Sequence, residues 1–224
     1  MTAVTLDRGQ SLIEVGERCR DVHFPSCGWI SLEVMAIDGE GLQVATVGRN
    51  GLINVSALFG DAGSPYRAVV QAETMALRVR AVDLIPVMQQ SAALRDAILV
   101  YGSRLLGEIA QISLCHRAHT VLQRLSRWLL TTTDYLDNEA VPVTQDALAH
   151  TLGVTRSAVA HALIELHAGG AIWSRRGAIA IRNRLRLERT VCECYRMVCN
   201  QAGDSRPVPV SHPADPAHQS SVTR

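Results

Sequence analysis

The sequence contains no lysine, so arginine supplies all 22 of its basic side chains. Genome composition alone can produce this bias, so it indicates nothing about mechanism. No apolar run approaches the roughly 20 residues that a membrane-spanning helix needs. The first ten residues also lack the charged-then-apolar order of a secretory signal peptide. We therefore expect a cytoplasmic protein with no membrane partner.

Signatures of catalysis are also missing. The sequence contains no Ser-His-Asp arrangement, nucleophile elbow, His-Glu-x-x-His zinc motif or phosphate-binding loop, and its eight histidines are scattered. A steep fall of nucleic-acid affinity with salt would separate a binding protein from an enzyme that acts on small substrates. We expect that the protein is not an enzyme.

The cysteines form no Cys-x-x-Cys pair. In a cytoplasmic protein they are not expected to form disulfides. Cys192 and Cys194 lie two residues apart on a predicted helix, so their side chains would point to different faces and would not easily share a metal ion. We predict no metal ligands and leave any cofactor unknown. The six cysteines are Cys19, Cys27, Cys115, Cys192, Cys194 and Cys199.

Charge is unevenly divided along the chain, although the net charge is only +1. Residues 1–116 hold 9 arginines and 12 acidic residues, a net charge of −3, whereas residues 117–190 hold 10 arginines and 6 acidic residues, a net charge of +4. A basic segment attracts the phosphates of nucleic acid. This division favours a nucleic-acid partner for the C-terminal half.

Residues 6–82 predict a compact all-β unit. Apolar residues alternate over 30–36, 42–46, 68–72 and 75–79, with turn residues every eight to twelve positions. Short strands at this spacing favour a barrel, a sandwich or a jelly roll. Residues 51–60 are the one part of this unit that reads as a short helix.

Two helices are predicted next. Asp83 can cap a short helix that ends near Gln90, and Ser91 can cap a longer one that runs through His116. The longer helix carries an apolar stripe that one small β unit would not cover, so we expect a second copy of the chain to cover it. The alternative is packing against the protein's own β unit. The predicted dimerisation residues are Leu94, Ile98, Tyr101, Leu105, Ile109 and Ile112.

Residues 143–166 read as a helix-turn-helix. Thr144 can cap the first helix and Thr155 the second, and Gly153 falls where the chain turns between them. In the second helix an apolar face leaves Arg156 and its neighbours free to meet base edges in the DNA major groove. An ordinary helical hairpin is the alternative.

A short hairpin over 171–181 follows, with a basic, glycine-bearing tip. Ile179 and Ile181 alternate with alanines as in a half-buried strand, and the tip arginines are placed to touch phosphates, the alternative being a solvated turn. Helix-turn-helix and hairpin together predict a winged helix that binds double-stranded DNA. The predicted DNA-contacting residues are Thr144, Gln145, Thr155, Arg156, Ser157, His161, Arg175 and Arg176.

Three further segments complete the C-terminal half. A helix opens at Val121, with Arg124 and Arg127 expected on its polar side, and residues 134–142 are expected to form a polar linker. A final helix is predicted over 185–200. From residue 201 onward, prolines and small polar residues predict a disordered tail.

A β-roll, a long helix and a winged helix in this order resemble the Crp/Fnr family of bacterial transcription regulators. The resemblance covers residues 6–200 and is strongest over 143–181. It implies an α+β fold with a jelly-roll-like sensor domain (1–82), a short helix and a dimerisation helix (83–116), a winged helix-turn-helix domain (117–200) and a tail (201–224). Members are homodimers that sense a small molecule and bind palindromic DNA, and RNA polymerase is a further candidate partner.

The resemblance also implies roles for single residues. Thr155, Arg156, Ser157 and His161 occupy the family's DNA-contacting positions. Arg156 matches the family's pattern, whereas Ser157 and His161 replace the glutamate and arginine often found there. We therefore expect a target sequence that differs from the best-known sites of this family.

The sensor half departs further from the family. Residues 51–59 resemble the phosphate-binding cassette of cyclic-nucleotide-binding domains, but Asn54 and Val55 take the places of its glycine and glutamate. Tyr66 falls where an arginine is expected, and Arg67 is one residue out of register. A valine cannot accept a ribose hydroxyl's hydrogen bond, and an unpaired buried polar group costs about 1 to 3 kcal/mol, so cyclic AMP is not the expected ligand. The predicted effector-pocket residues are Asn54, Val55, Ser56, Tyr66 and Arg67.

Other readings of the sensor stay open. The opening helix usual ahead of the family's β-roll is missing, so either the start is trimmed or the sensor is abbreviated. Haem is a candidate cofactor through His23, His116 or a cysteine. An iron-sulfur cluster would have to use three scattered residues, Cys19, Cys27 and Cys115. The remaining alternative is an interaction module that does not read DNA.

Overall fold

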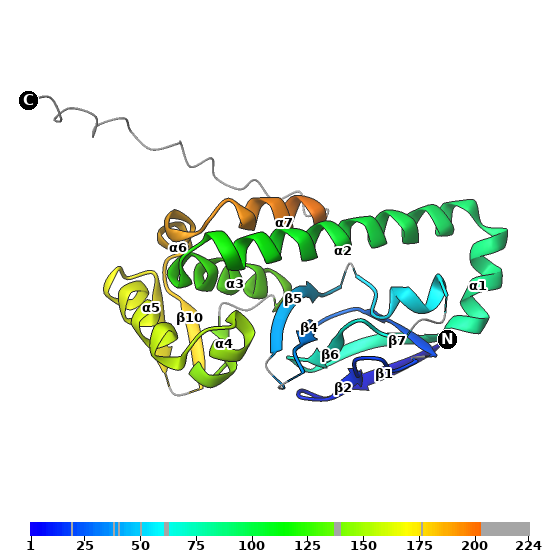
Figure 1. Ribbon diagram of the computed structural model, residues 1–224, viewed down its shortest axis with the longest axis horizontal. Helices are drawn as coiled ribbons and strands as arrows, with labels where there is room; N and C mark the ends of the chain where they lie inside the picture. The colour runs from blue at the N-terminus through cyan, green and yellow to red at the C-terminus, as the bar shows by residue number, and fades with distance from the viewer. Residues whose placement is uncertain are drawn as a thin grey trace, which may run out of the picture.

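A β-roll, a long helix lying along it and a C-terminal domain of short helices and a small sheet follow one another along the chain (Figure 1). The computed structural model describes residues 1–18, 20–37, 39, 41–49, 51–60, 63–136, 140–175 and 177–202. The predicted tail beyond residue 202 lies outside these residues. The α+β class and the order of the three parts agree with the sequence analysis.

The β-roll consists of two antiparallel sheets that face each other across one apolar core. One sheet has the order β1-β7-β3 and the other the order β2-β6-β4-β5. A short 3-10 helix, η1 (Val55–Leu58), lies in the segment predicted to be helical. The strands are β1 (Thr2–Leu6), β2 (Ser11–Ile13), β3 (Asp21–Pro25), β4 (Ile30–Met35), β5 (Gly41–Val47), β6 (Arg67–Val70) and β7 (Thr74–Arg80).

Strand β5 is buried on both faces, which its alternating sequence did not predict. Gln43 and Thr46 point away from the roll's interior but are covered by helices, and Gln43 Nε2 donates to Thr46 Oγ1 at 2.7 Å. Trp128 Nε1 donates to Gln43 Oε1 at 3.1 Å, and the Thr46 N–H donates to Glu108 Oε1 at 2.9 Å. Paired polar groups therefore fill the layer between β5 and the helices, as burial requires.

Helices α1 (Ala81–Gln90) and α2 (Ala92–Ala118) follow the roll. The Ser91 side chain accepts a hydrogen bond from the Leu94 N–H at 3.3 Å, which confirms its predicted role as a cap. The predicted cap at Asp83 is wrong, because α1 begins two residues earlier. Asp83 lies in its first turn, where the Arg80 guanidinium donates to both of its carboxylate oxygens at 2.8 Å.

The apolar stripe of α2 packs against the chain's own β-roll, so its assignment to the dimer interface is corrected. Ile98, Leu105 and Ile112 are buried, while Leu94, Tyr101 and Ile109 are partly buried against the roll's core. Tyr101 Oη donates to the Leu52 carbonyl at 2.9 Å. The roll is large enough to cover the stripe because two sheets and α1 together extend along most of the helix (Figure 1).

Among the described residues, α2 is the one helix whose length and composition would allow it to cross a membrane. No such segment was expected, because Arg95, Asp96, Arg104 and Glu108 interrupt its apolar residues. One apolar face of this helix packs on the core of the β-roll.

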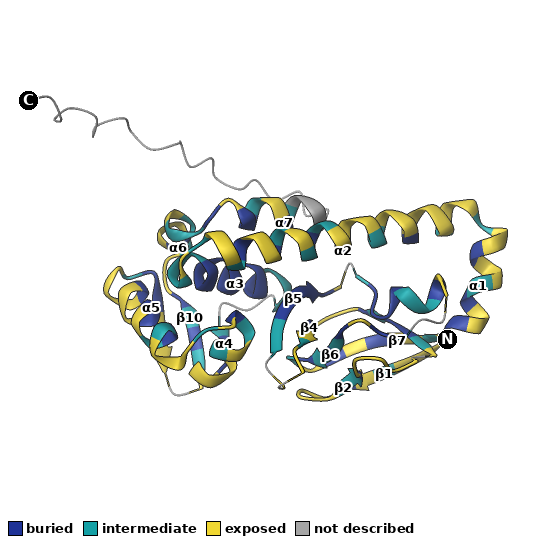
Figure 2. Ribbon diagram, in the orientation of Figure 1, coloured by how far each residue is buried: buried dark blue, intermediate teal, exposed yellow. Residues whose placement is uncertain are grey.

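Helix α3 (Val121–Leu136) is buried along most of its length (Figure 2). Arg124 and Arg127, expected on a polar side, are only 7% and 4% exposed. The Arg124 guanidinium donates to the Leu152 carbonyl. The expectation failed because the face that carries these arginines is covered by neighbouring parts of the fold instead of solvent.

The winged helix comprises two helices and a three-stranded sheet of order β8-β10-β9. Helix α4 packs on α5, and α5 packs on α3, so that α3 forms the floor of the domain. The predicted helix-turn-helix and hairpin are both present. The elements are β8 (Ala140–Val141), α4 (Gln145–Leu152), α5 (Arg156–Ala168), β9 (Ile172–Arg175) and β10 (Ala178–Ile181).

Two C-terminal predictions are corrected. The single final helix is two helices, α6 (Arg184–Thr190) and α7 (Cys194–Ala202), because Val191 is extended (φ −80°, ψ 150°) and ends the first. The predicted polar linker begins inside α3, where Asp134 accepts from Arg184 Nη2 at 2.9 Å and from Tyr195 Oη at 2.7 Å. These contacts of Asp134 fasten α6 and α7 to α3.

Buried Glu108 makes stability depend on pH. Burial raises the pKa of Glu108 from 4.5 in the unfolded chain to about 7. The hydrogen bond from the Thr46 N–H and the charge of Arg127 act in the opposite direction but are smaller effects. Between these values the native state binds more protons, so stability falls as pH rises through this window. We expect Glu108→Gln, which keeps an acceptor for Thr46, to be more stable than the wild type by about 1 to 3 kcal/mol near pH 8 and by little near pH 4.5.

Urea unfolding of both proteins across this range measures the difference. Burial lowers the pKa of His116 to about 4, which destabilises the native state below about pH 6.5, but this affects both proteins and cancels. Glu165→Gln, at an exposed position of α5, is the control and should show no such pH-dependent gain. A constant difference between Glu108→Gln and the wild type at all pH values would contradict the assignment.

Candidate nucleic-acid interface

The turn between α4 and α5 has the geometry that its residues predict. The Thr144 hydroxyl accepts from the Ala147 N–H at 3.1 Å and begins α4. Gly153 is left-handed (φ 56°, ψ 49°), and its N–H bonds the carbonyls of Ala149 and His150. A side chain here would strain the backbone and would meet Leu42 Cδ1 at 2.7 Å, so only glycine fits.

The first turn of α5 projects polar side chains into solvent. The Thr155 hydroxyl accepts from the Ala158 N–H at 3.3 Å and lies 3.0 Å from the Ser157 hydroxyl. Arg156 is 67% exposed, with Nε 3.5 Å from Asp146 Oδ1 of α4. A salt bridge this exposed contributes little, so the guanidinium can exchange this partner for a base edge.

Two further predicted contact residues, Gln145 and His161, are also at the surface of the winged helix. Gln145 is exposed at the start of α4, and His161 is exposed one turn beyond Ser157. The opposite face of α5 is buried through Val159, Leu163 and Leu166, as its periodicity predicts. The predicted residues of both helices are thus exposed, and the contact of Arg156 with Asp146 joins the first turns of the two helices.

The wing is an antiparallel hairpin of β9 and β10, in which Ile172 pairs with Ile181 and Ala178 with Arg175. Arg175 is exposed at its end, and Arg176 lies outside the described residues. Trp173 was not predicted as a contact residue, yet it is 48% exposed. Alternation with buried Ile172 would have placed it on the outer face.

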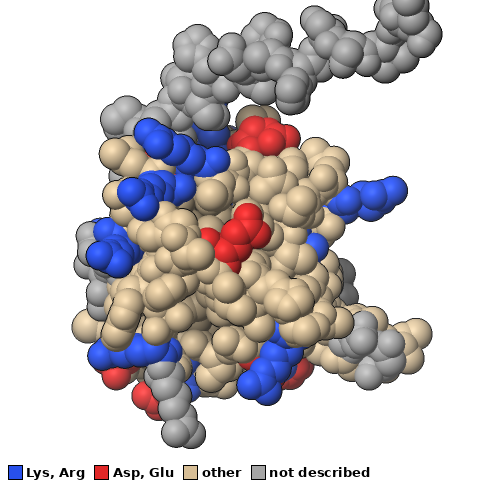
Figure 3. Space-filling model, turned by 90° about the vertical axis from the view of Figure 1, so that its left-hand side faces the viewer, with Lys and Arg blue, Asp and Glu red and all other residues tan. Residues whose placement is uncertain are grey.

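Arginine side chains border the end of the molecule that carries the winged helix (Figure 3). They lie along one edge and at the lower rim of this face, where acidic side chains adjoin some of them, and one acidic patch lies near its centre. The arginines at the margins can attract phosphates.

The helix-turn-helix also packs on the β-roll. His150 Nε2 lies 3.7 Å from Glu33 Oε2, and Gly153 packs on Leu42. On the roll's other margin, Arg8 Nη2 donates to the Pro142 carbonyl at 2.8 Å. A cleft lined by Gly41, Ala149, His150, Gly153, Val154 and Thr155 runs between the two parts. The turn that precedes α5 is therefore in direct contact with the sensor half.

The predicted effector pocket holds the protein's own side chains. Asn54 is left-handed (φ 68°) and 2% exposed, its Nδ2 donates to the Asp21 carbonyl at 3.0 Å, and its Oδ1 accepts from the Ser56 hydroxyl at 3.2 Å. Val55 belongs to the apolar core. The amide of Asn54 is thus used to shape the loop.

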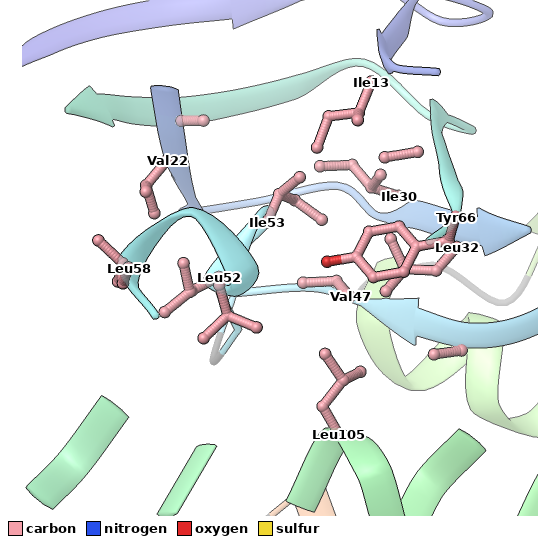
Figure 4. Packing of buried hydrophobic residues seen from close by; sticks show 14 of the residues in the cluster. Ile13, Val22, Ile30, Leu32, Val47, Leu52, Ile53, Leu58, Tyr66 and Leu105 are labelled. Atoms are coloured by element: carbon pink, nitrogen blue, oxygen red, sulfur yellow. The ribbon is translucent and has the colours of Figure 1, made fainter. Parts of the chain in front are cut away.

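Tyr66 and Arg67 point in opposite directions. The Tyr66 ring lies inside the roll beside Leu32 and Val47, with Leu105 of α2 below it (Figure 4). Arg67 is on the outer face of β6, where its Nε lies 3.3 Å from Glu14 Oε1. The assignment of Arg67 to the effector pocket is therefore corrected, because neighbouring strand residues alternate between faces and Tyr66 takes the inner one.

The haem and iron-sulfur candidates are separated. His23 is buried in β3, where burial lowers its pKa, whereas His116 lies near the end of α2 with Nε2 3.4 Å from the Gln43 carbonyl. Cys27 is exposed, whereas Cys115 is buried beside Cys192, and Cys19 lies outside the described residues. Of the set proposed for a cluster, the two described members therefore lie in different parts of the fold, Cys27 beside Met75 and Cys115 beside Cys192.

Family models match both halves of the chain. Residues 3–91 match the cyclic nucleotide-binding domain, and residues 123–190 match the Crp-like helix-turn-helix domain. The chain belongs to the Crp/Fnr family of transcription regulators. A comparison with curated protein sequences finds no match.

Solved structures of Crp/Fnr regulators share this fold. FixK2 from Bradyrhizobium japonicum is 18% identical, with a TM-score of 0.73 over 85% of this chain and 97% of FixK2. A CRP-family transcriptional regulator from Thermus thermophilus is 16% identical, with a TM-score of 0.71 over 92% and 100%. The c-di-GMP-responsive regulator CLP from Xanthomonas campestris is 15% identical, with a TM-score of 0.68 over 81% and 94%.

Replacing Arg156 tests the role of α5. Arg156→Ala should weaken binding to a selected duplex by about 1 to 3 kcal/mol, roughly 5- to 150-fold in Kd, and relax base choice at one position of each half-site. Arg175→Ala should instead weaken binding to all sequences and reduce the salt slope by about 1. Fluorescence anisotropy with matched and single-substituted duplexes measures both effects.

Arg95→Ala is the matched control, because it removes the same charge from an exposed site on α2, beside Asp96. Its affinity should stay close to that of the wild type. Equal losses for Arg156→Ala and Arg95→Ala would mean that α5 contributes charge alone and does not read bases.

Proposed function

We propose that this protein is a sequence-specific transcription regulator that binds palindromic DNA as a homodimer, with α5 in the major groove. The observation that carries the proposal is the exposed first turn of α5, where Arg156 and Ser157 face solvent, together with the exposed arginine Arg175 at the end of the wing strand β9. Membership of a family of DNA-binding regulators supports it. In this proposal the protein binds DNA in the cytoplasm and catalyses no reaction. RNA polymerase is a further partner.

The dimer interface that we propose is the outer face of α2. With the inner stripe covered, Leu99, Leu106 and Leu114 remain 50%, 68% and 52% exposed. Ser103 and Ala110 lie between them, also exposed, at spacings of three and four. A narrow stripe of leucines and small residues at this period matches the seam of two packed helices. Figure 2 shows this outer face as largely exposed.

Cyclic AMP is not the effector in this proposal. Two observations support this: Tyr66 fills the roll's interior among aliphatic side chains, and Arg67 is turned outward to Glu14. A cyclic phosphate would have to enter an apolar interior that offers no cation. Burying its unpaired charge there would cost free energy. Signals instead reach the winged helix through its contacts with the β-roll.

Selection from a random duplex pool tests the function. We expect enrichment of a two-fold symmetric site whose half-sites are centred about 34 Å, one helical turn, apart. Affinity should fall steeply with salt, and saturating cyclic AMP should leave Kd unchanged within about twofold. Failure to enrich any sequence would refute sequence-specific binding, and a cyclic AMP-dependent gain would refute the proposed sensor.

The dimer face is tested by Leu106→Asp. Two unpaired carboxylates would face each other in the interface, and we expect the dimer Kd to rise about 100-fold or more, with loss of affinity for the full palindrome. Sedimentation velocity measures the association. Val82→Asp, at a 66% exposed position of α1, should leave the dimer intact. An unchanged dimer in Leu106→Asp would place the interface elsewhere.

A further inference from the structure

Three cysteines and a histidine converge at the junction between α2 and the DNA-binding domain. The Cys115 and Cys192 sulfurs lie 3.6 Å apart, and Cys194 Sγ lies 3.6 Å from His119 Nδ1. All four ligand atoms lie within 4.8 Å of one another. The three thiols form a buried group separate from the two large apolar cores. They are therefore not simply small hydrophobes within a core.

The break between α6 and α7 creates this convergence. On a continuous helix Cys192 and Cys194 would point to different faces, which was the reason for predicting no metal ligands. Because Val191 is extended, Cys192 lies ahead of α7 and Cys194 in its first turn, and both sulfurs face the end of α2. The earlier expectation is thus corrected by the backbone course.

The spacing fits one tetrahedral ion. Ligands bound at about 2.0 to 2.3 Å from a tetrahedral Zn²⁺ lie about 3.5 to 3.8 Å apart, close to the two 3.6 Å separations. The sulfurs are farther apart than in a disulfide, in which they are bonded at about 2.05 Å. They are too close together for a [4Fe–4S] cluster, in which each cysteine binds a different iron atom.

The surroundings orient these groups as ligands. Glu193 Oε1 lies 3.2 Å from His119 Nε2, which leaves Nδ1 directed at the cysteines. Such a carboxylate–histidine pair fixes the tautomer of metal-binding histidines. Gln111 Nε2 donates to Cys194 Sγ at 3.0 Å. The Arg127 guanidinium lies beside the Cys115 thiol.

We propose that Cys115, His119, Cys192 and Cys194 form a structural Zn²⁺ site. Three thiolates, one divalent ion and the nearby Arg127 guanidinium sum to zero charge, so the buried site is electrically balanced. All four coordination positions are taken by protein, as in closed structural zinc sites.

The site would join segments far apart in sequence. Cys115 lies in the last turn of α2 and His119 lies between α2 and α3. Cys192 lies just ahead of α7, 77 residues after Cys115, and Cys194 begins α7. Helix α7 packs along α2 at this point (Figure 1). The ion would thus fix the DNA-binding domain to the end of the long helix. Its effect on DNA affinity rests on the function proposed above, whereas the site itself does not.

Metal binding is measured first on the full-length protein without DNA. Protein purified under reducing conditions should carry one zinc per chain by native mass spectrometry. Apo-protein titrated with Co²⁺ should show tetrahedral d–d bands and thiolate-to-cobalt charge transfer, reversed by Zn²⁺. In the wild type, Zn²⁺ should protect Cys115, Cys192 and Cys194 from alkylation and leave exposed Cys27 reactive.

Variants separate ligands from bystanders. Cys192→Ser and Cys194→Ser should lose the ion, and Cys27→Ser should retain it. Glu193→Ala, at an exposed position that the fold does not need, should weaken zinc affinity about 10- to 100-fold. The proposal is overturned if Zn²⁺ changes neither the cobalt spectrum nor alkylation, if Cys192→Ser retains the ion, or if the native protein carries a Cys115–Cys192 disulfide instead.

DNA binding is a separate measurement. Removing zinc should lower affinity for the selected palindrome about fivefold or more. If zinc binds with the expected stoichiometry but its removal leaves the affinity for DNA unchanged, the zinc site is supported and its coupling to DNA binding is refuted. If no DNA is bound in either state, the function proposed above fails while the zinc measurements still decide the site.

Discussion

Burial of one face of α2 against the β-roll is the interaction on which the rest of the structure depends. Ile98 and Leu105 are each buried there, and burying such a side chain contributes about 1.5 to 3 kcal/mol. Their sum is a large part of the stability of a domain. Because the inner face is occupied, only the outer face is free for a second copy, and the far end of the helix is where the DNA-binding domain must attach.

The polar layer between β5 and the helices gives this arrangement a second role. Gln43 bonds Trp128 of α3, and Thr46 bonds Glu108 of α2. A shift of β5 would therefore disturb both the long helix and the floor of the winged helix. Since buried polar groups tolerate few alternative pairings, such a layer favours discrete arrangements over gradual ones. A two-state regulator needs this property.

Local chemistry made much of the fold predictable. The caps at Ser91, Thr144 and Thr155 and the left-handed Gly153 depend on residues within three or four positions, so the sequence alone located both helices of the DNA-binding motif. The stripe on α2 was also visible. Its partner was not, because periodicity identifies an apolar face without saying what covers it.

The failures share one physical cause. Arg124 and Arg127 lie three residues apart on one face of α3, as surface residues of a helix often do. Other elements cover this face, so both arginines are buried. The periodicity of residues 185–200 continues through Val191, where packing against the end of α2 outweighs helix propensity. Tertiary contacts decided both, and these contacts brought together cysteines that lie 77 residues apart. The DNA-contacting residues stay predictions, because the exposure of a side chain does not identify the molecule that it binds.

The tryptophans give the molecule a built-in optical reporter. Trp29 of the β-roll and Trp128 of α3 meet edge to face across the domain boundary, with ring centroids 5.8 Å apart, and both are 3% exposed. The third, Trp173, stands on the wing and is 48% exposed. Separation of the domains would expose Trp29 and Trp128 to water and shift their fluorescence emission to longer wavelength. A DNA duplex bound against the wing would instead quench the fluorescence of Trp173. One unlabelled sample can therefore distinguish movement inside the protein from occupancy of its surface.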